Sequence, residues 1–132
     1  MEAPVTIALF TDTDLQKRAR KIARVGGVKN FTDEQLQYFM QNLPAEFARY
    51  DAQQTSDYLA LNAGLVAMNL VLALTDQGIG TNIILGFDKS KINEVLDIEE
   101  RFRPEVLITV GYAAEKVEPS YRLPVDEIID KR

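Results

Sequence analysis

The 132-residue sequence contains no cysteine, no histidine and no tryptophan. Without cysteine the chain has no disulfide framework and no thiolate nucleophile, which is typical of a reducing compartment such as the cytoplasm. Without histidine it lacks the common zinc ligand and the base of Ser-His and Cys-His catalytic pairs. We therefore expect no metal site and no catalytic side chain, and we expect any reaction to depend on a cofactor.

Positive charge is also scarce, with 15 Lys and Arg against 20 Asp and Glu and a net charge of −5. This balance disfavours nucleic acid and anionic membrane surfaces as partners. The longest apolar run, Leu59 to Leu74, is interrupted by Asn62 and Asn69 and falls short of the ~20 residues that cross a bilayer. The start, "MEAPVTIALF", lacks the basic segment of a signal peptide. The sequence thus predicts a soluble cytoplasmic protein.

Apolar residues make up 46 % of the sequence, which is enough for the core of one domain spanning residues 1–132. Three stretches have the composition of strands: "APVTIALF" (Ala3 to Phe10), "TNIIL" and "RPEVLITVGY". The first is an unbroken apolar run, and the first and third are both expected to be buried. Helical patterns separate them, so the fold class is predicted as α+β, with helices around a small central sheet.

The first helix is predicted from "TDTDLQKRARKIARVGG", with Leu15, Ala19 and Ile22 on its inner face and two glycines as its end. A dinucleotide phosphate is one possible partner for its basic face. A solvated helix surface is the simpler interpretation, and we prefer it. The basic residues of this face are Lys17, Arg18, Arg20, Lys21 and Arg24.

The second helix opens with Thr32 and Gln35 in the spacing of a capping box. Pro44 is expected to end this helix and begin a short turn. In that turn Phe47 and Tyr50 either line a site for a planar substrate or anchor the loop to the core, and we prefer the second interpretation. The residues expected on the buried face of the helix are Leu36, Phe39, Met40 and Leu43.

The longest helix is expected from Asp57 to about Gln77, with Ser56 as its N-cap. Its apolar residues lie nearly all round, so we expect it to be buried on most sides. Asn62 and Asn69 would then need polar partners, either to fix the register of the helix or to contact a ligand. A ridge of small residues allows close packing within the chain or against a second subunit, and we favour the subunit interface. The ridge consists of Ala60, Gly64 and Ala67.

The glycines of "DQGIGTNIILGF" do not form a dinucleotide fingerprint, because that motif follows a strand, opens a helix and has the spacing G-x-G-x-x-G. Here Ile83 occupies the third glycine position. Gly78 is expected instead to end the long helix in the left-handed conformation, and Gly86 permits close approach to the backbone. Asp88 is expected to cap a further helix, whose inner face would carry Ile92, Val95 and Leu96.

From Asp57 to the C-terminus the sequence resembles the flavin-dependent nitroreductase family. Four pieces in order carry the resemblance: "DYLALNAGLVAMNLVLALTDQGIGTNI", "LGFDKSKINEVLDI", "RPEVLITVGYAAEK" and "RLPVDEII". The strand "APVTIALF" and the helix after it agree with the same family. The resemblance implies FMN as cofactor and an intertwined homodimer with the long helix, buried, at its interface. The family's N-terminal flavin-binding segments have no counterpart here, so the resemblance implies a domain without its N-terminal part.

The resemblance also implies a flavin site at the end of the "TNIIL" strand. The main chain of Leu85 and Gly86 would face the central flavin ring, where an N–H can donate to flavin N5. Ile83 and Ile84 would cover the ring with apolar surface. Some relatives have a proline at Ile83 and an acidic residue at Leu85, and a main-chain contact tolerates both differences.

The FMN phosphate would pair with Arg122, since a guanidinium suits bidentate contact with phosphate. Ser120 is expected beside it, although some relatives have a second basic residue there. These contacts predict that the phosphate is held by residues near the C-terminus.

Two functions follow from the resemblance. The first is an FMN-dependent NAD(P)H oxidoreductase of the nitroreductase type, in which hydride passes from nicotinamide through flavin N5 to a planar nitroaromatic or quinone-like acceptor. The second is a non-catalytic remnant that serves only as a helical dimerisation module. A nucleotide-binding domain of another family is disfavoured because the sequence has no phosphate loop.

Overall fold

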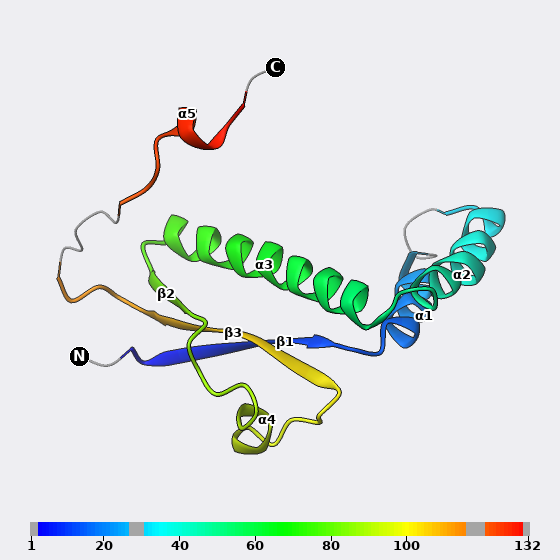
Figure 1. Cartoon of the computed structure of the whole chain (residues 1–132), viewed down its shortest axis with the longest axis horizontal. Helices are drawn as coiled ribbons and strands as arrows, with labels where there is room; N and C mark the ends of the chain where they lie inside the picture. The colour runs from blue at the N-terminus through cyan, green and yellow to red at the C-terminus, as the bar shows by residue number, and fades with distance from the viewer. Residues whose placement is uncertain (1–2, 27–30, 116–120, 131–132) are drawn as a thin grey trace.

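The computed structural model describes residues 3–26, 31–115 and 121–130. Within these ranges the fold is α+β, as predicted, with helices beside one small antiparallel sheet (Figure 1). In chain order the elements are β1 (Val5–Asp12), α1 (Leu15–Gly26), α2 (Asp33–Phe47), α3 (Ala52–Asp76), β2 (Gly80–Ile84), α4 (Ile92–Val95), β3 (Phe102–Gly111) and α5 (Val125–Ile128).

β3 is the central strand and pairs antiparallel with both neighbours, in the order β1-β3-β2. The register places Ile7 and Ile83 on either side of Ile108, whose side chain is fully buried. The predicted burial of β3 is therefore confirmed. The predicted burial of β1 is wrong, because as an edge strand it has a neighbour on one side only and none of its residues is buried. Its pairing is irregular between Leu9 and Phe10, the mark of a β-bulge.

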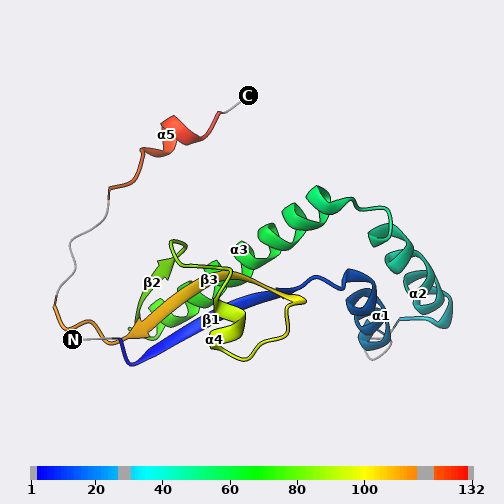
Figure 2. The same ribbon diagram turned by 60° about the horizontal axis from the view of Figure 1, so that its bottom comes forward.

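α3 lies along one face of the sheet, and α1 and α2 form a separate lobe beyond the end of β1 (Figures 1 and 2). The core between α3 and the sheet is a cluster of Ala67, Val106 and Ile108, with partly buried residues such as Leu9 and Val71 packed around it. In the lobe, α1 contacts α2. The described core is thus small and lies under one side of α3.

The start of α3 differs from the prediction, which placed its N-cap at Ser56. The helix begins at Ala52, and Asp51 is the N-cap. The Asp51 carboxylate accepts a hydrogen bond from Gln54 N (2.7 Å), and Asp51 N donates to the Gln54 side-chain oxygen (3.0 Å), which completes a capping box. Ser56 lies inside the helix and is bound by Arg103 instead.

The prediction that α3 is buried on most sides is also wrong for a single chain. Its buried residues, Leu59, Ala63 and Ala67, lie on one side of the helix. Neither Asn62 nor Asn69 is buried, and Asn62 Nδ2 donates to the Tyr58 carbonyl oxygen of its own helix (2.8 Å). By length and composition alone α3 is apolar enough to cross a membrane, with 17 % of its most apolar window buried. For a single helix that already packs on a sheet, this is a weak indication of a membrane span.

In α1, Leu15 and Ala19 are buried as predicted, whereas Ile22 is exposed. The α2 capping box is confirmed by Gln35 N donating to Thr32 Oγ1 (3.3 Å) and Thr32 N donating to Gln35 Oε1 (3.1 Å).

The predicted stop at Pro44 is wrong, since α2 continues to Phe47. The predicted buried face of α2 is also wrong. Phe39 and Met40 are exposed and no residue of α2 is buried, because this helix packs mainly on α1 at the edge of the molecule.

The link from α3 to β2 matches the prediction. Gly78 has a φ of 73°, Gly78 N donates to Thr75 O (2.9 Å) and Ile79 N donates to Leu74 O (3.0 Å), as in a Schellman motif. The helix predicted after Asp88 is reduced to the single turn α4, and its N-cap is Lys91. Its expected inner residues Val95 and Leu96 are exposed.

Candidate functional site

The four site residues predicted at the end of β2 lie together at the surface. Ile83 and Ile84 are the last two residues of β2, and Leu85 and Gly86 follow directly. The exposed fractions are 43 % for Ile83 and 67 % for Leu85, so the end of β2 is not part of the core. A Cβ atom placed on Gly86 would meet no heavy atom within 4 Å. The main chain at this point is therefore open to a planar group.

Arg122 lies outside this group within one chain. Its Nη1 donates to the carbonyl oxygen of Tyr121 (2.8 Å), and its side chain is exposed. Figures 1 and 2 both show α5 and the segment before it set apart from β2. Ser120 lies outside the described residues. The structure thus brings Ile83, Ile84, Leu85 and Gly86 together and does not bring Arg122 to them in a single copy.

The aromatic residues near the start of α3 favour the anchoring role preferred from the sequence. The rings of Phe47 and Tyr50 are 5.5 Å apart between centroids, and those of Phe47 and Tyr58 are 5.1 Å apart. Tyr58 belongs to α3, so these contacts tie the α2–α3 connection to the long helix.

A polar cluster between β3 and α3 was not found from the sequence. Glu105 is buried, and its carboxylate accepts hydrogen bonds from Thr11 Oγ1 and from Arg103 Nε (2.7 Å). The same guanidinium donates to Ser56 Oγ (2.8 Å) and to Ser56 O (3.1 Å). The only sequence signal is the pair of charged residues in "RPEV" at the start of an apolar strand. The cluster joins β3 to β1 and α3, and we interpret it as structural.

An exposed apolar stripe runs along α3 on a different side from its buried residues. The exposed fractions are 64 % for Leu61, 63 % for Leu65, 48 % for Met68 and 58 % for Leu72. Their spacing of i, i+4, i+7 and i+11 places them on one side of the helix. Gly64 lies beside this stripe, and a Cβ atom placed on it would meet nothing within 4 Å. Such a stripe on a small chain is typical of a protein–protein interface.

Comparison with known proteins gives a consistent result. Residues 2–112 match the model of the nitroreductase family. A provisionally named NAD(P)H nitroreductase of Streptococcus pyogenes is 63 % identical over 131 residues, which cover 99 % of this chain and 65 % of that protein.

Two solved structures have the same fold. A nitroreductase family protein of Streptococcus pneumoniae is 86 % identical with a TM-score of 0.91, covering 98 % of this chain and 65 % of that one. A provisionally assigned nitroreductase of Exiguobacterium sibiricum, solved in complex with FMN, is 27 % identical with a TM-score of 0.86, covering 96 % and 61 %. The chain therefore spans slightly less than two thirds of the length of each of these three proteins.

Proposed function

The chain belongs to the nitroreductase family, and we propose that it contributes to an FMN-dependent NAD(P)H oxidoreductase that acts as a homodimer in the cytoplasm. The observation that carries the proposal is the open main chain at Leu85 and Gly86, beside the exposed side chain of Ile83. The FMN-bound relative from Exiguobacterium sibiricum supports FMN as the cofactor.

The fit to FMN rests on the surface at the end of β2. Ile83 and Ile84 would supply apolar surface for the flavin ring, and the main-chain N–H of Leu85 or Gly86 would donate to flavin N5. Gly86 leaves room for this because no atom lies within 4 Å of the position that a side chain would occupy. When bound, FMN supplies the redox chemistry, taking hydride from NAD(P)H and reducing a planar nitroaromatic or quinone-like acceptor. The protein would bind and orient the reactants.

The FMN phosphate would be held by Arg122, with Ser120 beside it. A guanidinium is suited to two parallel hydrogen bonds to phosphate oxygens. Arg122 is exposed, and its Nη1 donates to the carbonyl oxygen of the preceding residue, Tyr121, which leaves its other donors for a ligand. Because α5 is set apart from β2 in one chain, we propose that a second copy completes the crevice.

The homodimer would form through the exposed stripe of α3, which consists of Leu61, Leu65, Met68 and Leu72. The buried residues of α3 lie against the sheet and leave this stripe uncovered in the described chain. Packing two such helices against each other would remove the stripe from water, at roughly 25 cal/mol per Å² of apolar area. Gly64 would allow the two helices to approach closely.

Titration of the purified chain with FMN tests the cofactor assignment. We expect saturable quenching of flavin fluorescence that is lost or weakened at least about tenfold in Arg122→Ala, as expected for the loss of a charge-assisted phosphate contact. Arg49→Ala removes an exposed arginine elsewhere and should leave the titration unchanged. A free-flavin spectrum at all FMN concentrations, beside a dimeric mass, would support the dimerisation module instead.

Sedimentation tests the dimer separately. We expect the chain to sediment as a dimer and the double variant Leu61→Glu/Leu65→Glu to sediment as a monomer with unchanged helix content by circular dichroism. Gln53→Glu, an exposed change near the start of α3, should remain dimeric. A dimeric double variant would exclude the stripe as the interface, and recovery only in detergent would point to a membrane.

A further inference from the structure

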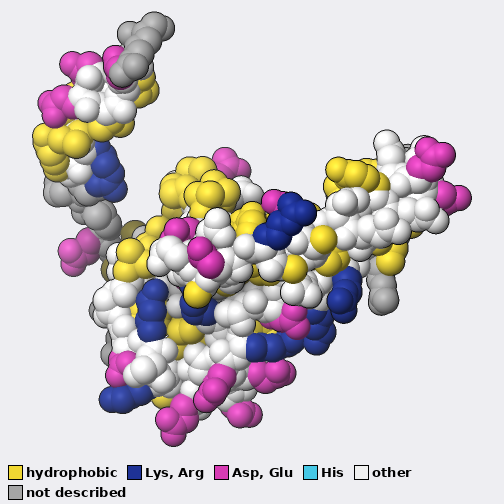
Figure 3. All heavy atoms as spheres, turned by 45° about the vertical axis from the view of Figure 1, so that its right-hand side comes forward, with side chains coloured by type: hydrophobic (Ala, Val, Ile, Leu, Met, Phe, Trp, Pro, Cys, Tyr) yellow, Lys and Arg dark blue, Asp and Glu magenta, His cyan; other side chains and the backbone are white. Residues whose placement is uncertain are grey.

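A concave basic surface lies where the α1–α2 lobe joins the sheet. It encloses about 570 Å³, and we call it the basic groove. Figure 3 shows Lys and Arg side chains gathered in this part of the molecule. The acidic side chain in its lining is Asp12. The other lining residues are Lys17, Arg18, Arg20, Lys21 and Arg101. Such a concentration of positive charge stands out on a chain with a net charge of −5.

The basic residues of α1 are placed where they weaken the helix. α1 contains no acidic residue, and Lys17 lies four residues before Lys21 and three before Arg20. Like charges at these spacings repel each other on a helix surface. Lys17 and Arg18 also lie in the first turn, where the helix dipole disfavours positive charge. An anion in the groove would relieve both effects.

Most of these cations are available to a ligand. Among the described residues, the ion pairs involve Arg101 but none of the four basic α1 side chains of the groove. Arg101 lies 3.9 Å from the Asp12 carboxylate and 3.1 Å from that of Glu99. A phosphate group would therefore meet several donors that no carboxylate of the described chain already engages.

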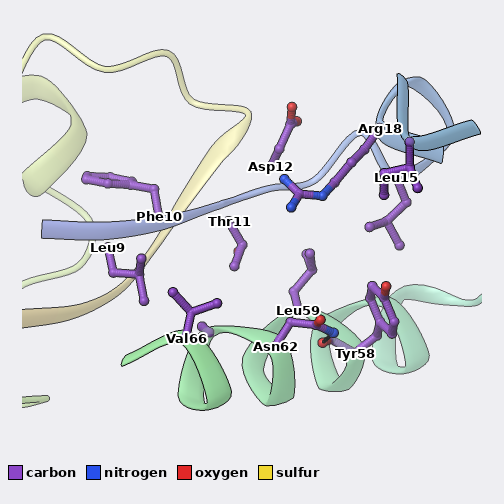
Figure 4. A pocket seen from close by; sticks show the side chains of 12 residues that line it. Leu9, Phe10, Thr11, Asp12, Leu15, Arg18, Tyr58, Leu59, Asn62 and Val66 are labelled. Carbon is purple, nitrogen blue, oxygen red and sulfur yellow. Dashed lines mark hydrogen bonds between the residues drawn. The ribbon is translucent and has the colours of Figure 1, made fainter. Parts of the chain in front are cut away.

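A second cavity lies next to the groove and is lined mainly by apolar side chains instead of basic ones. It encloses about 290 Å³ between β1, α1 and α3, and we call it the apolar slot. Asp12 and Arg18 line both cavities, so the two adjoin each other. Figure 4 shows the Arg18 side chain running from α1 toward β1, where its guanidinium lies near Asp12. The slot is also lined by Leu9, Tyr58, Leu59, Asn62 and Val66.

The slot suits a planar base. Leu9, Leu59 and Val66 offer apolar contact, and Tyr58 offers an aromatic ring. The Asn62 amide donates through Nδ2 to Tyr58 O, and its Oδ1 makes no hydrogen bond within the part of the chain that is described. That oxygen is free to accept from an amino group on a base. The slot is too small for a whole dinucleotide but matches one ring system.

We propose that the basic groove and the apolar slot together bind an adenine nucleotide that carries two or more phosphate charges. The phosphates would lie among the α1 cations and Arg101, and the base would enter the slot beside Tyr58. Because the rest of the chain is acidic, a small ligand fits better than a long polyanion, whose distant phosphates would be repelled. The site uses no residue of the proposed flavin site.

Calorimetric titration of the purified chain with ADP tests this site. We expect saturable binding that weakens about tenfold or more in Arg20→Gln/Lys21→Gln, because each neutral side chain removes a charge-assisted contact. The matched control Arg49→Gln/Lys91→Gln removes two exposed charges elsewhere and should bind ADP as the wild type does. Binding should also weaken as salt is added, since the groove is exposed.

A separate variant tests whether the base binds in the apolar slot. Val66 is 55 % exposed, so Val66→Phe can fill the mouth of the slot without entering the core. ADP binding should then fall to the affinity measured for inorganic pyrophosphate, and pyrophosphate binding should not change. If the wild type binds pyrophosphate as tightly as ADP, the proposal is overturned and the groove is only a general anion patch.

Three further results would also overturn the proposal. They are an ADP titration without a binding signal, an equal loss of ADP affinity in Arg49→Gln/Lys91→Gln, and a duplex DNA probe that binds more tightly than ADP.

A parallel FMN titration distinguishes the nucleotide site from the flavin site. Arg20→Gln/Lys21→Gln should leave flavin quenching intact, and loss of FMN binding in that variant would show that the groove belongs to the flavin site.

Discussion

The guanidinium of Arg103 in β3 holds both the hydroxyl and the backbone carbonyl oxygen of Ser56 in α3, at 2.8 and 3.1 Å. The same group pairs with the buried carboxylate of Glu105 at 2.7 Å. One side chain thus joins the central strand to the long helix and neutralises a buried charge. The face of α3 that meets the sheet is fixed partly by this contact.

Replacing Arg103 with alanine should therefore lower the free energy of unfolding by about 2 kcal/mol, because Glu105 is left as a buried charge with fewer partners. Urea denaturation followed by circular dichroism measures the change. Arg49→Ala, which breaks an exposed pair with Glu46, should cost less than ~0.5 kcal/mol. Equal losses in the two variants would show that the Arg103 cluster contributes no more than a surface pair.

The N-cap of α3 gives a second prediction. Asp51→Ala should lower the free energy of unfolding by about 1 kcal/mol, because the first turn loses the acceptor for Gln54 N. Asp51→Ser should recover most of that loss, since serine caps a helix as well as aspartate. Denaturation curves of the three proteins decide the matter. If Asp51→Ser loses as much stability as Asp51→Ala, the aspartate stabilises the protein through something other than capping.

Adding a side chain at Gly78 should lower stability because of the backbone conformation and not because of a steric clash. Its φ of 73° lies in the left-handed region, and the position of a Cβ atom is free of neighbours within 4 Å. Gly78→Ala should therefore cost about 1 kcal/mol without a steric clash. Gly78→Asn should cost less, because asparagine tolerates this conformation. Thermal or urea unfolding measures both variants. A Gly78→Ala protein more stable than Gly78→Asn would contradict the left-handed conformation as the cause.

Asp88 provides a prediction on pH. The hydrogen bond from the Ser90 side chain, followed by the contact with Lys91, lowers the pKa of the Asp88 carboxyl below its ordinary value of 3.8. A lowered folded-state pKa contributes stability above the ordinary pKa, and this contribution is lost as the pH falls through the lowered value.

Ser90→Ala should accordingly move the pKa of Asp88 upward, which a carboxyl-carbon NMR titration can follow. Lys91→Gln should produce a smaller shift in the same direction, because its contact is the weaker cause. If the pKa of Asp88 rises more in Lys91→Gln than in Ser90→Ala, the ion pair with Lys91 is the main cause of the lowered pKa.

Local signals in the sequence predicted much of the fold. The spacing of Leu15 and Ala19, the Thr32–Gln35 capping box and Gly78 each act through neighbouring residues, and each is found where it was expected. The start of α3 was missed because Asp51 and Gln54 also have capping-box spacing, and a choice between two possible caps depends on the tertiary contacts of Ser56.

Burial was predicted less well, because it depends on what covers an element. β1 has the apolar composition of a central strand but lies at the edge of the described sheet. The stripe of α3 has the composition of a core helix but faces outward. For the candidate site, Ile83 to Gly86 lie at the end of β2 with Ile83 and Leu85 exposed, and their role in flavin binding stays a prediction. It could not show that Arg122 would lie apart, since no local pattern records the path of the last residues.

The position of β3 at the middle of the sheet has a consequence for the behaviour of the chain in concentrated solution. With the order β1-β3-β2, the outer sides of β1 and β2 carry main-chain N–H and C=O groups that no further strand of the described sheet engages. Such margins can recruit strands from other molecules and seed aggregates. The pairing of β1 is irregular at Leu9 and Phe10, where β3 has the extra residue Glu105, and the added local twist should discourage this on the β1 side. β2 has no such irregularity in its pairing, so it is the side from which unwanted assembly is expected to start.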